Sequence, residues 1–349
     1  GTLTPKYDKV ADLYDLFLAD LDNDIKVFTT AQNQARLTSQ DVIYGGDMTK
    51  WAKLANSLKL KIAARLIHQN FEKAKQIVAQ VKSASCGVMD GEADNFTFNK
   101  CADNNYNKDY AYQTGNGLGT LYASKTYIDF MLKNQDPRVR FIYAKNSWNS
   151  KVVDSFLKAG KAVPSFIMAN VETEEIDGKT RFKAWKGVGE PWVRYHGYPT
   201  DFNVGVDAEF ADWFKADNAK YDDQHSYNRI SYIQEEMLRG RVDFTVPVAA
   251  EDDTKVIQDT EDVPWWGMYM STAEVNLYLA EFAIYEGATA QAQAYFQKAV
   301  KASVEEYDFL AAKNKIPYYG KTYDYDPFEA VIDLKEGEVE TLLGMADYQ

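Results

Sequence analysis

The segment from Trp185 to Trp213 contains the residues best suited to form a binding site. It combines aromatic rings with polar and charged side chains: Trp185, Trp192, Tyr195, Tyr198 and Trp213, interleaved with Arg194, His196, Asp201 and Asn203. Aromatic faces can cover the apolar C–H faces of a sugar ring while nearby polar groups meet its hydroxyls. Glycines and prolines interrupt the segment, which predicts loops, where binding residues commonly lie. The same residues could instead form an aromatic minicore that pins a long loop, and the segment alone leaves both alternatives open.

No pattern in the chain predicts catalysis. The three histidines, His68, His196 and His225, do not have the spacing of metal ligands, and there is no Gly-x-Ser-x-Gly elbow. A glycosidase needs a pair of carboxylates, and the 52 acidic residues include many pairs without indicating a particular one. We therefore expect a protein that is not an enzyme and that uses no cofactor.

Two further stretches resemble ligand-binding loops but lack essential residues. Residues 103–109 carry oxygen ligands at alternate positions, as calcium loops do, but Lys108 replaces the required glycine and Thr114 the bidentate glutamate. Residues 115–119 read Gly-Asn-Gly-Leu-Gly, which is an incomplete dinucleotide fingerprint and follows no convincing strand. We expect neither a metal site nor a nucleotide site in these stretches.

The composition is typical of a globular protein that does not bind nucleic acid. The 349 residues can bury one large core or two smaller ones. A formal net charge of −13 argues against contact with phosphates or anionic lipid, but not against neutral sugars. No apolar run approaches the length of a membrane span.

The two cysteines, Cys86 and Cys101, form no Cys-x-x-Cys motif, which disfavours a zinc site. In an exported protein they could form a disulfide that closes a short loop and contributes about 3 kcal/mol. The alternative is two free buried thiols.

The stretch from Asp41 to Leu66 predicts the central helix of the protein. Gly45 and Gly46 mark a turn, after which Asp47 or Thr49 can cap the first helical turn. Apolar residues then recur at intervals of three and four and predict one buried stripe: Trp51, Leu54, Ala55, Leu58, Ile62 and Leu66. Lys50, Lys53 and Lys59 lie off this stripe. A second helical run at 71–81 follows a short link, so we expect two antiparallel neighbours.

Weaker sequence patterns predict the remaining helices, strands and loops. Helices are expected at 7–30, 121–133, 207–219 and 270–305, the last with a capping box of Ser271 and Glu274 and a break at Gly287. Asp177-Gly178 predicts a hairpin turn, residues 96–98 a short strand, and residues 318–325 a polar loop. In the 121–133 helix the side chains expected in the core are Tyr122, Tyr127, Ile128 and Met131.

The sequence around the central helix resembles that of a known family. Tyr44 to Asp47, Trp51, Asn56 to Leu60 and Arg65 match a Tyr-Gly-Gly-Asp turn, a Trp and an Asn-Ser-Leu-Lys-Leu run of the SusD/RagB-like nutrient-binding outer-membrane lipoproteins of Bacteroidetes. Lys61 departs from that pattern, because the family usually has arginine there. Three further matches are Pro5 to Asp8, Asp136-Pro137-Arg138, and Ala273 to Val275 with Leu279 to Glu281. The resemblance is thin between residues 140 and 265.

The resemblance implies a mainly α-helical fold. It consists of helical hairpins of tetratricopeptide-like type that form a curved scaffold, with a loop-rich insert containing a few short strands. We expect residues 1–349 to form a single domain, with the scaffold at 1–83 and 265–349 and a ligand-binding insert at 84–264. The family continues beyond both ends of this chain, and a signal peptide and a lipid-bearing cysteine would precede it.

The function that the resemblance implies is capture of a nutrient at the cell surface without catalysis. A glycan or oligosaccharide would be bound and delivered to a SusC-like TonB-dependent outer-membrane transporter. Given the family, sugar binding becomes the favoured interpretation of the aromatic segment, with the rings of Trp192 and Tyr195 facing one groove. The alternatives are a helical-repeat protein that binds peptide or protein partners, and a helical glycoside hydrolase.

Overall fold

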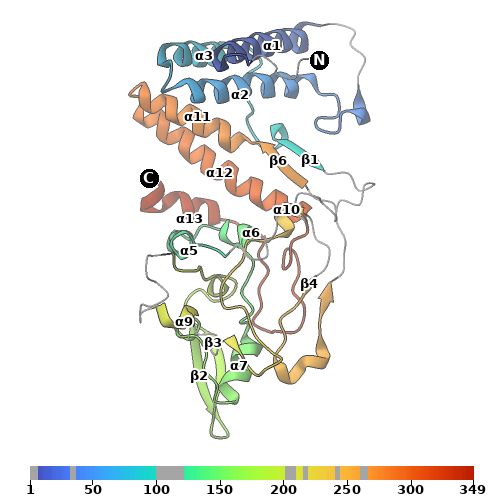
Figure 1. Cartoon of the computed structure of the whole chain (residues 1–349), viewed down its shortest axis with the longest axis vertical. Helices are drawn as coiled ribbons and strands as arrows, with labels where there is room; N and C mark the ends of the chain where they lie inside the picture. The colour runs from blue at the N-terminus through green and yellow to red at the C-terminus, as the bar shows by residue number, and fades with distance from the viewer. Residues whose placement is uncertain are drawn as a thin grey trace. The chain divides into compact units, whose positions relative to one another are not determined.

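The computed structural model describes residues 7–31, 37–99, 122–200, 210–214, 219–239, 244–259 and 266–349. Helices dominate and the strands are few and short, which confirms the predicted mainly α class (Figure 1). The chain divides into two compact units, each assembled from distant parts of the sequence. Unit 1 contains residues Gly1–Phe98 and Met268–Glu306, together with Gln349; unit 2 contains Asn99–Gly267 and Tyr307–Tyr348.

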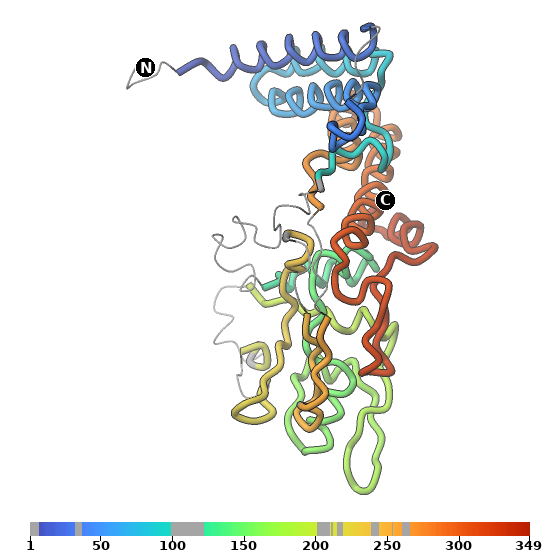
Figure 2. Tube along the Cα trace, turned by 90° about the vertical axis from the view of Figure 1, so that its right-hand side faces the viewer, coloured from blue at the N-terminus to red at the C-terminus, as the bar shows by residue number. Residues whose placement is uncertain are grey.

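Unit 1 is built around one helix, α2. Its helices are α1 (Val10–Thr30), α2 (Met48–Leu66), α3 (Phe71–Ser83), α11 (Thr272–Tyr285) and the first part of α12 (Thr289–Lys313). Figures 1 and 2 show α1 running alongside α2 and α3 folding back next to it, as the short link predicts. The 270–305 prediction is confirmed as the pair α11 and α12, which is broken at Gly287, where φ is 73°.

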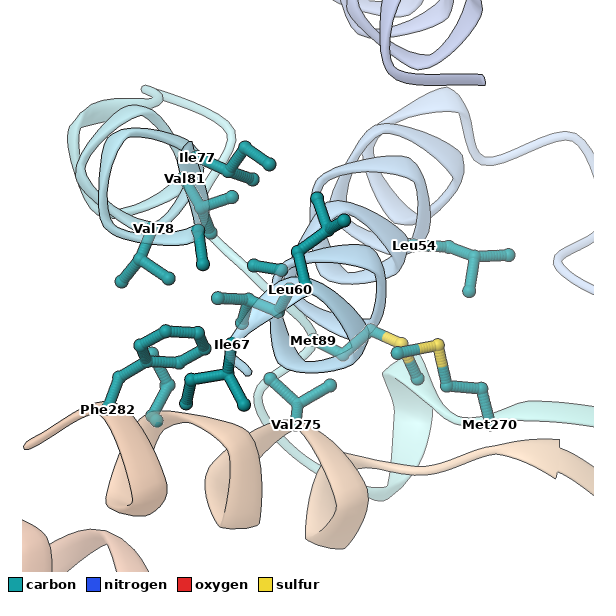
Figure 3. Close-up of a cluster of buried hydrophobic side chains, with 14 of the residues drawn as sticks. Leu54, Leu60, Ile67, Ile77, Val78, Val81, Met89, Met270, Val275 and Phe282 are labelled. Atoms are coloured by element: carbon teal, nitrogen blue, oxygen red, sulfur yellow. The ribbon is translucent and has the colours of Figure 1, made fainter. Parts of the chain in front are cut away.

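The core of unit 1 forms where α2, α3 and α11 meet (Figure 3). Each helix contributes buried aliphatic or aromatic side chains: Leu54, Leu60 and Ala63 from α2, Ile77, Val78 and Val81 from α3, and Val275, Leu279 and Phe282 from α11. The predicted single stripe on α2 is too narrow, because Leu60 and Ala63 are fully buried while Trp51, Leu58 and Ile62 are only partly buried. Helices cover α2 on more than one side, so its buried face is wider than one stripe.

Lys59 corrects a second prediction for α2, since it lies inside the fold. Its side chain is buried, and its Nζ lies 2.5 Å from Asp22 Oδ1 of α1. By contrast α1 itself has no buried residue, and its apolar side chains Tyr14 and Leu18 are only partly buried against the core. This helix is therefore attached through half-buried apolar contacts together with ion pairs such as Lys73–Asp15.

Side-chain caps explain where the helices of unit 1 begin. The Asp47 carboxylate accepts from the amides of Thr49 and Lys50, and the Asn70 side chain accepts from Lys73 N at the start of α3. Ser271 accepts from the amide of Glu274, as the capping box predicts. Glu274 departs from that box, because its carboxylate instead pairs with Lys61 and accepts from the Tyr278 hydroxyl.

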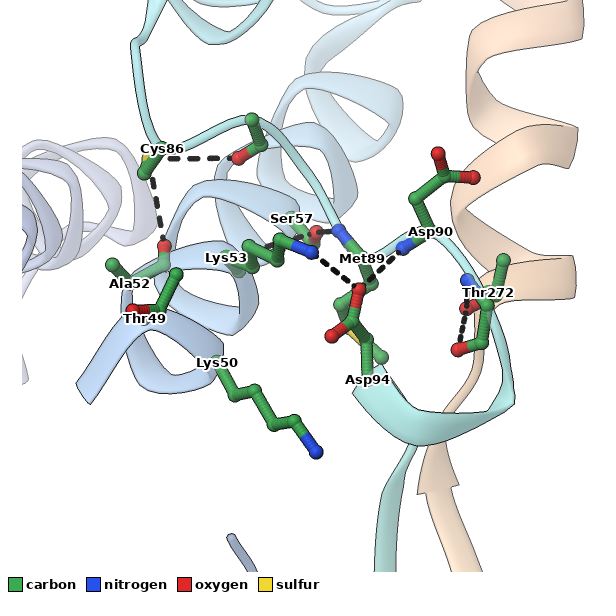
Figure 4. Close-up of polar contacts among 12 residues, drawn as sticks. Thr49, Lys50, Ala52, Lys53, Ser57, Cys86, Met89, Asp90, Asp94 and Thr272 are labelled. Atoms are coloured by element: carbon green, nitrogen blue, oxygen red, sulfur yellow. Dashed lines mark hydrogen bonds and ion pairs between the residues drawn. The ribbon is translucent and has the colours of Figure 1, made fainter. Parts of the chain in front are cut away.

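Polar contacts fix the loop that follows α3 against α2 (Figure 4). Asn56 donates to the carbonyls of Val81 and Gly87, and the Ser57 hydroxyl accepts from Met89 N. Lys53 Nζ lies 2.8 Å from Asp94 Oδ2. The Asn-Ser pair of the helix therefore supplies polar partners for a loop backbone that would otherwise be buried without them.

Three two-stranded sheets supply the extended structure. They pair β1 (Phe96–Asn99) with β6 (Trp266–Met270), β2 (Val171–Ile176) with β3 (Lys179–Trp185), and β4 (Phe244–Thr245) with β5 (Gln258–Asp259). The predicted strand at 96–98 and the predicted hairpin are confirmed. Asp177 and Gly178 both have positive φ, 50° and 72°, as a two-residue hairpin turn with the matching twist requires.

Unit 2 has short helices joined by long irregular segments. Within the described ranges its α-helices are the end of α12 and α5 (Lys125–Lys133), α6 (Val139–Ile142), α7 (Ser150–Lys158), α8 (Ser165–Met168), α9 (Ala211–Phe214), α10 (Glu236–Arg239) and α13 (Glu338–Gly344). In the predicted 121–133 helix, Ile128 and Met131 are buried, but Tyr122 and Tyr127 are 49% and 45% exposed. The helix begins at Lys125, so Tyr122 lies before it, in an extended segment. Tyr318, predicted to lie in a polar loop, is buried.

Some expectations concern residues outside the described part of the chain. Cys101, the stretch 103–109 and the glycines of 115–119 lie there, so the choice between a Cys86–Cys101 disulfide and two free thiols stays open. The expected absence of a metal site and of a nucleotide site in these stretches stays a prediction. Within the described part, no helix combines the length and apolar character needed to cross a membrane.

Asp41 holds the turn that precedes α2 through four hydrogen bonds. Its Oδ1 accepts from the amides of Ile43 and Tyr44 at 3.0 and 3.2 Å, and its Oδ2 accepts from Gly46 N and Trp51 Nε1, both at 2.8 Å. Burial alone would raise the pKa of Asp41, but these four donors outweigh it and lower the pKa below its ordinary value. The ionised carboxylate therefore stabilises both the turn and the position of Trp51.

We expect Asp41→Asn to reduce the free energy of unfolding at pH 7 by about 1–3 kcal/mol, because a charged acceptor is lost. A depressed folded-state pKa means that the carboxylate contributes above the unfolded pKa of about 3.9 and that this contribution is lost as the pH falls through the folded value. The gap between parent and variant should therefore narrow in acid, measured by urea unfolding between pH 7 and pH 3. Asp24→Asn on α1 is the charge-matched control, and an equal, pH-independent loss in both variants would contradict the role of Asp41.

Candidate functional site

Three extended segments of unit 2 lie side by side, at residues 122–124, 196–198 and 230–233. Ala123 N donates to Ser231 O at 2.9 Å, and Tyr198 N donates to Ala123 O at 2.6 Å. Ser231 N in turn donates to His196 O at 2.8 Å. These backbone bonds fix the register of the three segments, each of which carries one tyrosine.

The three tyrosines, Tyr122, Tyr198 and Tyr232, form what we call the tyrosine column. The Tyr122 ring centroid lies 5.1 Å from that of Tyr198 and 4.9 Å from that of Tyr232, at interplanar angles of 28° and 31°. Such spacings are those of stacked aromatic pairs. Burial raises the pKa of Tyr198, and burial together with a hydrogen bond to Tyr122 raises the pKa of Tyr232 to about 12. Both hydroxyls are therefore protonated and can donate.

Gly197 allows the 196–198 segment to approach the start of α5. A Cβ at this position would lie 2.3 Å from both the Cα and the backbone N of Lys125, closer than real Cβ contacts allow. Lys125 N donates to Tyr198 O at 2.9 Å across the same contact. The absence of a side chain at Gly197 therefore lets the column form.

A cleft of about 290 Å³ opens beside the column, and we call it the tyrosine cleft. It is lined by the column and by aromatic, polar and basic neighbours: Trp213, Ala219, Lys220, Ser226, Tyr227, Asn228, Arg229 and Ile230. Trp213 stacks on Phe166 with centroids 4.3 Å apart, and its Nε1 donates to Gly197 O. The cleft therefore combines ring faces with amide, hydroxyl and cationic groups, an arrangement that can bind a sugar.

The described part of the chain shows no arrangement suited to metal chemistry, since no group of three His, Cys, Asp or Glu side chains is placed to hold an ion. Burial lowers the pKa of His196 to about 4, so this imidazole is neutral at physiological pH. Among the described lining residues of the tyrosine cleft there is no carboxylate that could act as an acid or base on a bound glycan.

Arg194, one of the predicted ligand residues, is completely buried. Its guanidinium lies 2.6 Å from Glu190 Oε1, and Lys145 Nζ lies 2.9 Å from Glu190 Oε2. Burial by itself raises the pKa of Glu190, but the two cations outweigh it and lower the pKa. The charge of Arg194 therefore faces the interior of unit 2.

Trp192 and Tyr195 line a different cavity, of about 330 Å³, together with His196. Trp192 lies in a 3₁₀ turn, η6 (Trp192–Arg194), with the Arg140 guanidinium 5.0 Å from its ring centroid. Tyr195 is only 1% exposed, so its ring face is not open to a ligand. Trp185 packs on Phe182 at 4.9 Å in another buried cluster.

The tyrosine cleft thus contains two of the residues predicted from sequence, Tyr198 and Trp213, while Asp201 and Asn203 lie outside the described residues. Sequence reasoning missed the remainder of the lining, above all Tyr122, Tyr232 and Arg229. One signal was available, because residues 221–232 mix three tyrosines with histidine, asparagine and arginine in an irregular stretch. That is the same criterion that singled out the segment at 185–213.

A family model matches residues 1–167, and its description is "Starch-binding associating with outer membrane". Many solved SusD-like structures share the fold of the chain. The chain has the SusD-like fold, and its residues 1–167 match the SusD-like family model. No curated protein matches it by sequence.

Three solved structures illustrate how far the shared SusD-like fold extends. A SusD homologue from Bacteroides fragilis is 19% identical with a TM-score of 0.53, over 99% of this chain and 56% of its own. A SusD-like protein from Bacteroidetes AC2a is 20% identical with a TM-score of 0.52, over 98% and 59%. A chitin-binding protein is 19% identical with a TM-score of 0.52, over 98% and 54%. The SusD-like chain therefore spans little more than half the length of the structures it matches.

We expect Gly197→Ala to lower the free energy of unfolding by about 1–3 kcal/mol, as overpacking does, because the added methyl meets backbone that cannot rotate away. Gly344→Ala is the matched control in the same unit, since no atom lies within 4 Å of its added Cβ. Urea unfolding of both variants measures the difference. A Gly197→Ala protein as stable as the parent would show that the two segments are not packed this closely.

Proposed function

We propose that this SusD-like chain binds a glycan in the tyrosine cleft, without catalysis, at the cell surface. The observation that carries the proposal is the tyrosine column, whose rings lie beside polar lining groups in a cleft of about 290 Å³. Tyr122 is 49% exposed, so its ring is accessible to a ligand. Stacking of sugar C–H faces on such rings, with hydroxyls meeting Asn228 and Ser226, is a recognised way to bind a neutral ring system.

The comparisons support the ligand class and the location. The matching family is described as starch-binding and associated with the outer membrane, and one structure of the same fold is a chitin-binding protein. Both names refer to polysaccharides. For this chain we propose an outer-membrane lipoprotein whose lipid anchor would be attached ahead of Gly1.

We further propose that the chain delivers its ligand to a SusC-like TonB-dependent transporter. The support is the family resemblance at Tyr44 to Asp47 and along α2. An affinity-tagged form of the full protein, expressed in its native membrane, should co-purify with such a transporter in mild detergent. Recovery without any TonB-dependent transporter would contradict this step and leave glycan binding unaffected.

We expect Tyr122→Ala to weaken glycan binding about tenfold, the effect of losing about 1.4 kcal/mol of ring contact. A glycan array identifies a ligand, and calorimetric titration with that ligand compares parent and variant. Tyr127→Ala is the matched control, because Tyr127 is 45% exposed in the same unit and does not line the cleft. Melting temperatures recorded in parallel should fall only slightly in both variants.

Equal affinities for Tyr122→Ala and parent would exclude the tyrosine cleft as the site. Trp192→Ala then tests the cavity of about 330 Å³ that Trp192 and Tyr195 line, because the prediction from sequence places the ligand on these two rings. Peptide ligands on a parallel array would favour the alternative of a peptide-binding repeat protein. Release of reducing ends from a bound glycan would contradict the absence of catalysis.

A further inference from the structure

A further cavity, of about 320 Å³, lies next to the tyrosine cleft, and we call it the adjoining cavity. Asn228 and Tyr232 line both spaces. One segment of chain borders them in turn, since residues 226–230 and 232 line the cleft while residues 228 and 232–236 line the cavity. Asn228 is exposed, so the two spaces meet at the surface of unit 2. A ligand that fills the cleft therefore lies beside the cavity.

Backbone hydrogen bonds hold this shared segment in place. Ser147 N donates to Asn228 O at 2.8 Å, and Ala144 N donates to Tyr232 O at 3.0 Å. These bonds attach the segment to residues 144–147, in addition to the bonds that fix it beside the other two tyrosines of the column. Both shared residues therefore keep one position relative to the cleft and to the cavity.

Two buried phenols of the adjoining cavity lack hydrogen-bond partners. Tyr195 and Tyr318 line the cavity and are 1% and 4% exposed. None of the described residues is hydrogen-bonded to the hydroxyl of either. Burial raises the pKa of both hydroxyls, which are therefore protonated and can donate. Because buried polar groups of native proteins are nearly always hydrogen-bonded, these two donors require an acceptor that the described chain does not supply.

The hydroxyl of Tyr195 lies on the side of the adjoining cavity, although this residue also lines the cavity of about 330 Å³. The charges that act on the hydroxyl are those of Arg140, Glu190 and Arg194, and Arg140 lines the adjoining cavity and not the other one. Two nitrogens of Arg140 lie 2.6 Å from the Glu338 carboxylate oxygens, but its Nε has no acceptor among the described residues. A third donor without a partner therefore borders the same space.

The remaining lining of the adjoining cavity combines apolar surface with acceptor groups. Phe244 and Pro317 line it, and the Phe244 ring centroid lies 5.4 Å from that of Tyr318 in a T-shaped contact. Gln234 and Glu235 line it as well and carry acceptor oxygens. A sugar unit has apolar C–H faces, hydroxyls that donate, and ring and hydroxyl oxygens that accept. The cavity therefore contains a complement to each of these features.

We propose that the adjoining cavity is a second sugar subsite, and that the ligand is an oligosaccharide whose consecutive units occupy the tyrosine cleft and the cavity. This inference rests on the proposed glycan-binding function. One unit contacts the tyrosine column, the next accepts hydrogen bonds from Tyr195 and Tyr318, and Asn228 and Tyr232 lie at the linkage between them. A ligand held at two linked subsites binds more tightly than a ligand held at one, because the second contact forms within the same complex.

The test measures how affinity depends on the length of the ligand. Calorimetric titration uses maltooligosaccharides and chitooligosaccharides of one, two and four units. In at least one series we expect the tetramer to bind about tenfold or more tightly than the monomer. Tyr318→Phe should reduce this ratio about threefold, because it removes one donor and keeps the ring. Tyr127→Phe, the same change at a tyrosine that lines neither space, should leave the ratio unchanged.

Melting curves of the variants distinguish a ligand contact from a structural role of the hydroxyl. A hydroxyl that is buried without a partner destabilises the fold, so Tyr318→Phe should leave the melting temperature unchanged or raise it. Tyr195→Phe should act in the same direction on both the melting temperature and the affinity ratio. A clear fall in melting temperature in both variants would show that the hydroxyls are satisfied within the chain, and would overturn the second subsite.

The outcomes separate the second subsite from the proposed function. Equal ratios in the parent, Tyr318→Phe and Tyr195→Phe, with binding that Tyr122→Ala weakens, overturn the subsite while glycan binding at the cleft stands. Equal affinity for monomer and tetramer in every series that binds also overturns it. Where neither series binds, the one- to four-unit series of the glycan selected on the array takes their place. An array that selects no glycan overturns both proposals.

Discussion

The fold of unit 2 depends on one buried ion cluster in which Glu190 bridges Lys145 and Arg194. The side chains of all three are at most 2% exposed, so no solvent compensates their charges and each requires the others. Removing one partner of such a cluster typically costs about 3–5 kcal/mol, because an unpaired charge stays inside. The cluster binds the segment at 190–194 to the segment at 144–146, and Asn146 N donates to Arg194 O beside it. The ion cluster thereby fixes the position of Arg194, from which the chain continues to Tyr198 of the tyrosine column.

Shortly after Arg194 in the sequence, Gly197 packs against the backbone of Lys125. The contact is so close that only glycine fits, and the backbone bonds across it determine that Tyr198 stacks on Tyr122. The third ring, Tyr232, lies on a segment that is bonded to the same 144–146 segment, because Ala144 N donates to Tyr232 O at 3.0 Å. The interior of unit 2 thus contains paired charges and packed aromatic rings, while the half-exposed Tyr122 lies beside the tyrosine cleft. Arg194 therefore belongs to the interior of the unit, while the less buried tyrosines line the cleft.

Unit 1 follows a different principle, in which one helix is surrounded by the others. Because α2 is covered on several sides, polar residues on it are buried and must find partners. Asn56 and Ser57 bond to the last turn of α3 and to the loop after it, and Lys59 pairs with Asp22 of α1. The Asn-Ser-Leu-Lys-Leu run that carries the family resemblance therefore has a physical role, since Asn56 and Ser57 satisfy backbone groups and the buried Lys59 is paired with Asp22.

The sequence by itself determined the elements whose signals are local. The start of α2 at Asp47, the turn at Asp177-Gly178 and the cap at Ser271 follow from short-range chemistry that acts within a few residues. The helical class and the family resemblance rest on the same kind of signal. Only the tertiary structure decided which rings meet, because Tyr122, Tyr198 and Tyr232 come from distant segments joined by backbone bonds that no periodicity encodes. It also decided that Lys59 and Arg194 are buried, since the burial of a charge depends on whether a partner such as Asp22 or Glu190 is brought to it.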